Sequence, residues 1–92
     1  MNKQELSNRV AEKVSSTKKL AEQNVDAVLE VIQETLANGE SVKLIGFGNF
    51  FVKYKDARVG RNPSNGEEVQ IPAKRVPAFK AGKLLKDALK GV

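Results

Sequence analysis

The segment from Lys53 to Pro72 constrains the fold most, because it holds too few large apolar side chains to build a core. A run of turn-forming residues, Asn62-Pro63-Ser64-Asn65-Gly66, divides it, and the chain then continues through Val69 and Ile71. Two short extended runs joined by such a turn predict a two-stranded β-ribbon held away from the body. Within the run, Asn65-Gly66 is most simply a two-residue hairpin turn of the primed type.

A first helix is predicted immediately after Asn2, which can cap it. Leu6, Val10 and Val14 recur every four residues and form one apolar stripe over about three turns. The run Ser15-Ser16-Thr17 then breaks the pattern.

The second predicted helix begins at a Thr17 cap and stops at Asn38-Gly39, where glycine readily takes the left-handed backbone that ends a helix. A pair of helices like this also opens helix–turn–helix proteins, which read bases with the second helix. Here the polar face of that helix carries four acids that would repel DNA: Glu22, Asp26, Glu30 and Glu34. The two helices are therefore interpreted as scaffold.

After Gly39 the apolar period changes to two, which predicts strands. The chain is expected to be one α+β domain spanning residues 1–92, as one domain is all that 92 residues allow. Its expected parts are a helical dimerisation base (1–38), a small antiparallel sheet (41–52 and 73–80), a β-ribbon arm (53–72) and a C-terminal helix (83–90).

The apolar surface is too large for one thin sheet to cover. Without the ribbon about seventy residues remain, yet the second helix is apolar over much of its circumference. Leaving such faces exposed to water would cost several kcal/mol in a marginally stable domain, since each Å² of buried apolar surface contributes about 25 cal/mol. An intertwined homodimer sharing one core is therefore expected. Its predicted core residues are Leu29, Ile32, Leu36, Phe47, Phe50 and Phe79.

Several residue types are missing, which disfavours catalysis. The chain has no Cys and no His, so thiolate nucleophiles, the usual zinc sites and the commonest general base are absent. Gly46-Phe47-Gly48 lacks the third glycine of a nucleotide-binding loop. We expect no enzymatic activity, cofactor, metal or small-molecule substrate. No signal peptide or membrane span is apparent, so a cytoplasmic location is expected.

The net charge of +5 is concentrated in the second half of the chain. Residues 1–39 carry five cations and six acids, whereas residues 72–92 carry six cations and one acid. Such a chain favours polyanionic partners through counterion release. A basic ribbon with a proline near its tip suits a nucleic-acid groove, because cations neutralise phosphates and the rigid ring can wedge between bases.

Four motifs resemble those of the bacterial histone-like HU family, which includes integration host factor. They are Gly46-Phe-Gly-Asn-Phe50, Arg58-Val-Gly-Arg-Asn-Pro-Ser-Asn-Gly-Glu67, Ile71-Pro-Ala73 and Val76-Pro-Ala-Phe-Lys-Ala-Gly-Lys83. The resemblance runs from Met1 to about Lys90. It implies an intertwined dimer with a helical base, a saddle of sheets and two arms that embrace double-stranded DNA.

The resemblance also implies roles for individual residues. Pro63, with Asn62 beside it, would insert between base pairs. The arm cations would be Lys53, Lys55, Arg58, Arg61, Lys74 and Arg75, and the phosphate contacts on the body would be Lys3, Lys80, Lys83 and Lys86. The expected function is non-specific bending and compaction of DNA in the nucleoid, with kinked, nicked or gapped DNA preferred. A sequence-specific factor of the integration host factor type stays open, as does an RNA- or protein-binding module.

Three positions depart from the family pattern. Phe51 and Tyr54 stand where polar or acidic residues are common, and Phe51 is expected to pack under the root of an arm. Ser15 occupies a helix exit where glycine is common. If the backbone there is left-handed, serine costs about 1 kcal/mol relative to glycine.

Overall fold

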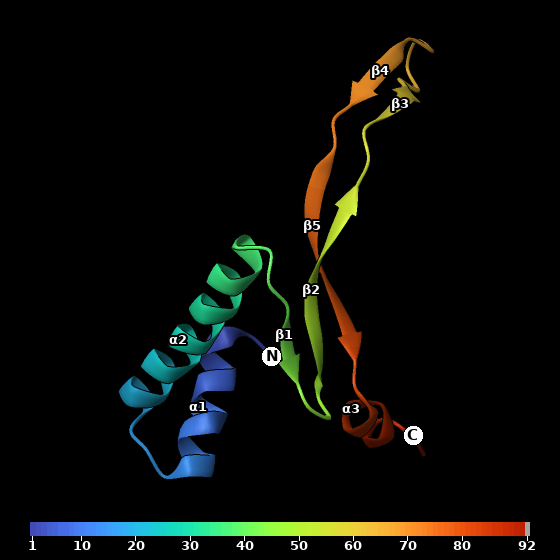
Figure 1. Cartoon of the computed structure of the whole chain (residues 1–92). Coiled ribbons are helices and arrows are strands. Elements are labelled where there is room, and N and C mark those ends of the chain that lie inside the picture. Colours follow the sequence, from blue (N-terminus) through green and yellow to red (C-terminus); the bar gives the residue numbers. More distant parts are fainter. Residues whose placement is uncertain (92) are drawn as a thin grey trace. The chain divides into compact units, whose positions relative to one another are not determined.

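The computed structural model describes residues 1–91 and contains three helices and five strands in that range. They follow in the order α1 (Lys3–Val14), α2 (Lys18–Ala37), β1 (Val42–Leu44), β2 (Gly48–Lys55), β3 (Arg58–Arg61), β4 (Glu68–Ile71), β5 (Lys74–Ala81) and α3 (Lys83–Ala88). The chain divides into two compact units, Met1–Thr35 and a second that begins at Leu36. Figure 1 shows the elements in sequence colours.

In the first unit, small side chains are buried most completely. Ala11 and Ala21 are buried hydrophobic residues, and Ser7 is buried with its hydroxyl donating to the carbonyl of Lys3 at 2.9 Å. The larger apolar side chains Leu6, Val28 and Leu29 keep between 43% and 58% of their surface exposed in the single chain. This unit therefore has little core of its own.

The predicted ends of the two long helices are confirmed. The side chain of Asn2 accepts a hydrogen bond from the amide of Glu5 at 2.8 Å, and Thr17 accepts one from Leu20 at 3.1 Å. Helix α2 ends as predicted: Gly39 has φ 82°, and its amide donates to the carbonyl of Leu36.

Ser15 has a left-handed backbone at the exit of α1, with φ 56° and ψ 44°. We expect Ser15→Gly to raise the free energy of unfolding by about 1 kcal/mol, because glycine has no Cβ to clash in this conformation. The melting temperature would rise by roughly 4–8 °C. Thermal denaturation followed by circular dichroism measures this change. Ser16→Gly is the matched control, and it should not raise the melting temperature, because its backbone is not left-handed.

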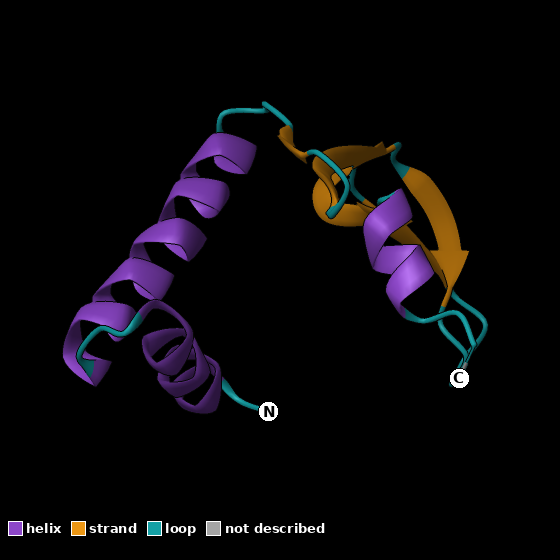
Figure 2. Cartoon of the chain, turned by 90° about the horizontal axis from the view of Figure 1, so that it is seen from below, coloured by secondary structure: helices purple, strands orange, loops and turns teal. Residues whose placement is uncertain are grey.

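The second unit is built on a three-stranded antiparallel sheet in the order β1-β2-β5. Strands β2 and β5 pair over eight residues each, from Gly48↔Ala81 to Lys55↔Lys74. The ring of Phe79 lies 4.7 Å from that of Phe50 and 5.8 Å from that of Phe47, between ring centroids. Figure 2 shows α3 beside the strands, where the amide of Leu84 donates to the carbonyl of Gly46.

Strands β3 and β4 form a separate two-stranded ribbon, from Arg58↔Ile71 to Arg61↔Glu68. In Figure 1 it continues from the far ends of β2 and β5, away from α3. The ribbon was predicted over residues 53–72, but β2 and β5 keep their sheet pairing as far as Lys55 and Lys74.

The predicted two-residue turn at Asn65-Gly66 is wrong. The strands end at Arg61 and Glu68, and the six residues between them form the loop. Gly66 has a positive φ, but Asn65 does not, whereas a turn of type I′ needs both. The polar side chains explain the longer loop, because the Asn62 side chain accepts from the Ser64 amide and the Asn65 side chain from the Glu67 amide.

Candidate nucleic-acid interface

The pairing of β2 with β5 sorts the side chains of the sheet onto two faces, since alternate residues of a strand point to opposite sides. Phe50 pairs with Phe79 and Val52 with Pro77, so these four share the apolar face. The opposite face, here called the basic face, carries the residue pairs that alternate with these along β2 and β5. Its members on β2 and β5 are Asn49, Phe51, Lys53, Lys55, Lys74, Val76, Ala78 and Lys80.

Four of the predicted DNA contacts therefore lie together on the basic face: Lys53, Lys55, Lys74 and Lys80. Phe51 lies among them and is half-buried, opposite Ala78. Arg75 does not join them. It pairs with Tyr54 on the side of Phe50 and Phe79, and its guanidinium donates to the carbonyl of Ala37 at 3.1 Å.

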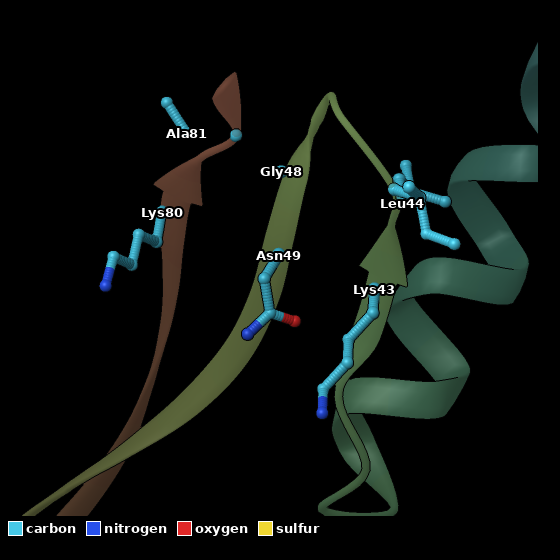
Figure 3. A pocket seen from close by; sticks show the side chains of 8 residues that line it. Lys43, Leu44, Gly48, Asn49, Lys80 and Ala81 are labelled. Carbon is cyan, nitrogen blue, oxygen red and sulfur yellow. The ribbon is translucent and has the colours of Figure 1, made fainter. Parts of the chain in front are cut away.

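The basic face extends onto β1, whose Lys43 was not among the predicted DNA-binding residues. Lys43 pairs with Asn49, and Asn49 pairs with Lys80, so one side chain from each strand forms a row across the sheet. Figure 3 shows this row and the shallow pocket that it helps to line. The side-chain oxygen of Asn49 is buried there without a hydrogen-bond donor. Alternation in Val42-Lys43-Leu44 was the signal that could have identified Lys43.

The ribbon carries its two arginines on opposite faces, because Arg58 pairs with Ile71 and Arg61 with Glu68 three positions later. The guanidinium of Arg61 donates to the carbonyl of Gly66 at 3.2 Å and lies 4.0 Å from the carboxylate of Glu68. Arg61 thus supports the loop while its side chain stays 72% exposed. Pro63 lies in that loop and is exposed, next to the half-buried Asn62.

Among the body cations, Lys83 and Lys86 are exposed on α3, and Lys3 lies in the first unit. The Lys3 ammonium is 2.8 Å from the carboxylate of Asp26. The hydrogen bond and negative charge of Asp26 raise the pKa of Lys3 above its ordinary value of 10.5. The contribution of this ion pair to stability is therefore present below pH 10.5 and lost as the pH rises through the higher folded-state pKa.

In the described part of the chain, no helix is long and apolar enough to cross a membrane.

A protein-family model described as bacterial DNA-binding protein matches residues 1–90. The chain belongs to this family.

Individual members of the bacterial DNA-binding protein family match the chain over nearly its whole length. The chain is 62% identical to the DNA-binding protein HU of Staphylococcus aureus strain COL over 90 residues, which cover 98% of this chain and 100% of that protein. It is 56% identical to DNA-binding protein HU 1 of Bacillus subtilis strain 168 over 91 residues, covering 99% of each. The resemblance drawn from the four sequence motifs is confirmed.

The solved structures of the family confirm the predicted α+β fold. A cocrystal structure of Anabaena HU with DNA superposes with a TM-score of 0.91 at 49% identity and covers both chains completely. HU from Thermotoga maritima superposes with a TM-score of 0.71 at 39% identity, covering 98% of this chain and 100% of that one.

Proposed function

We propose that the chain is a homodimeric, histone-like protein that binds double-stranded DNA with little sequence preference and bends it. The observation that carries this proposal is the basic face. Five lysines from three strands lie on one side of the sheet, and the ribbon beyond it adds two arginines. Membership of the bacterial DNA-binding protein family supports the proposal, as does the Anabaena HU cocrystal with DNA.

A second copy of the chain would complete the core. Phe47 and Phe79 are 49% and 42% exposed in the single chain, although their rings pack against each other. Leu29 is 47% exposed, and Ile32 and Leu36 are half-buried on the same helix. A dimer that buries these side chains would use the helical base, residues 1–38, and would carry two arms, each built on the β3–β4 ribbon, with a combined charge of +10 from two chains of +5.

Binding would combine electrostatic affinity with local deformation of DNA. The lysines of the basic face, with Arg58, Arg61, Lys83 and Lys86, would neutralise phosphates, and Lys3 would do so after leaving Asp26. Pro63 would enter between two base pairs at the tip of each arm. Unstacking costs a few kcal/mol per step, which the additional phosphate contacts of bent DNA offset. The protein would then associate with the nucleoid.

The salt dependence of DNA affinity tests this proposal. If roughly eight of these cations in one dimer neutralise phosphates at the same time, the plot of log affinity against log salt concentration has a slope of about −7. Fluorescence-anisotropy titrations at several salt concentrations measure that slope. A slope near zero would contradict the proposal.

Lys43→Ala tests the extension of the basic face onto β1. Each lost phosphate contact changes the slope by about 0.9, so two copies per dimer should make it less steep by about 1.8. The matched control is Lys13→Ala, which removes the same charge from an exposed position on α1. If both variants change the slope equally, Lys43 acts only through net charge.

A further inference from the structure

Of the two strands that lead into the arm, β5 contacts the end of α2 and β2 brings a side chain near the turn that follows it. From β5, Arg75 donates a hydrogen bond from Nη1 to the carbonyl oxygen of Ala37, the last residue of α2, at 3.1 Å. The last carbonyls of a helix have no partner within the helix and carry partial negative charge. A guanidinium is therefore well placed at this position, both as a donor and as a cation.

From β2, Tyr54 reaches the turn that follows the same helix. A Cβ built on Gly39 would lie 3.6 Å from the Tyr54 hydroxyl oxygen, which is ordinary van der Waals contact. Tyr54 and Arg75 are direct partners in the ladder, so their side chains leave the sheet on the same side. One pair of the sheet thus places an Arg75 hydrogen bond on the end of α2 and the Tyr54 hydroxyl near the Gly39 turn that follows it.

The pair Tyr54↔Arg75 lies at the end of the sheet from which the arm extends. The pair Tyr54↔Arg75 is followed by one more pair, Lys55↔Lys74, after which the ladder between β2 and β5 ends. Figure 1 shows the two strands continuing into the β3–β4 ribbon beyond this point. A contact at the last pairs of the sheet is placed to restrain the two strands where they leave it.

We propose that Arg75 and Tyr54 form an arm-root clamp at the end of α2 and act as positioning residues for the arm. That the arm binds DNA rests on the proposed function. Arg75 does not contact phosphate in this assignment. To do so it would leave Ala37 and turn to the opposite face of the sheet, where Lys74 and Lys53 lie. The clamp sets the angle of the arm before DNA arrives, which reduces the ordering that binding requires.

Arg75→Met removes the charge and the donors and keeps an unbranched apolar chain. The matched control is Lys74→Met, which removes the same charge from the adjacent residue on the basic face. Two quantities are measured for each dimer: the salt slope of DNA affinity, and the hydrogen exchange of backbone amides without DNA. Lys74→Met should make the slope less steep by about 1.8 and leave exchange within about twofold of the unaltered protein.

For Arg75→Met, the salt slope should equal that of the unaltered protein. Amides at the arm root, in residues 53–55 and 74–76, should exchange about tenfold faster, while those near Gly48 and Phe50 stay unchanged. A general loss of stability would accelerate both groups. Tyr54→Ala, which changes no charge, should give the same local acceleration.

A slope that falls with Arg75→Met as it does with Lys74→Met would overturn the clamp and make Arg75 a phosphate contact. Unchanged exchange at the arm root in both the Arg75 and Tyr54 variants would overturn it as well. If Lys74→Met leaves the slope unchanged, the proposed DNA-binding face fails instead, and the exchange measurement still decides whether the clamp exists.

Discussion

Replacing Pro63 by Ala is expected to reduce DNA bending far more than DNA binding. The pyrrolidine ring is the rigid apolar group at the exposed loop of the ribbon, and it is the group that would hold a base step open. The proposed phosphate contacts, which would supply most of the affinity, would come from lysines and arginines that the substitution leaves in place. We expect circularisation of short DNA to fall about tenfold and affinity for linear DNA to fall only about two- to threefold.

The control for this variant is Ser64→Ala in the same loop. The amide of Ser64, not its hydroxyl, makes the hydrogen bond to the Asn62 side chain, so the loop should keep its shape. Circularisation and affinity should both stay close to those of the unaltered protein. If Pro63→Ala lowers circularisation and affinity by equal factors, Pro63 shapes the turn and does not wedge between bases.

The largest loss of stability is expected from Gly82→Ala. A Cβ on Gly82 would lie 2.5 Å from the carbonyl oxygen of Gly46 and 3.0 Å from the carbonyl carbon of Phe47. Both are backbone atoms, so neither can move aside as the end of a side chain could. The amide of Gly82 also donates to the carbonyl of Phe47 at 2.7 Å, which holds the two segments together.

We expect Gly82→Ala to lower the free energy of unfolding by about 3 kcal/mol. Its melting temperature would fall by roughly 12–24 °C. Gly60→Ala is the matched control: the one atom its Cβ would crowd is the terminal Cδ1 of Ile71, at 2.9 Å, and that atom can move. It should cost less than about 1 kcal/mol. Equal losses in the two variants would show that the backbone contact at Gly82 is not what limits the substitution.

Local signals in the sequence were sufficient for the helices. The caps at Asn2 and Thr17 and the stop at Gly39 depend on residues within one turn, and all three are confirmed. The arm was also predictable, because a cationic run with few apolar residues cannot form a core. Its loop was not. The Asn-Gly pair predicted a two-residue turn, but the side chains of Asn62 and Asn65 stabilise a six-residue loop instead.

Which side chains share a face of the sheet could be worked out only from the strand register, and the sequence alone does not reveal that register. Lys74 and Arg75 are adjacent cations and were both assigned to DNA, yet the ladder places them on opposite sides. Lys43 was missed for a related reason. Only pairing through Asn49 brings it into one row with Lys80, a residue 37 positions further along the chain.

Competition among three DNA duplexes of about 30 base pairs, long enough for a bent site, tests the central claim most directly. The first has an arbitrary sequence, the second is its scramble, and the third carries central nicks in the first sequence. We predict equal affinity for the two intact duplexes and at least about tenfold tighter binding to the nicked one, because the nick removes part of the unstacking cost. A strong preference for one intact sequence, or no gain from the nicks, would contradict a non-specific protein that bends DNA.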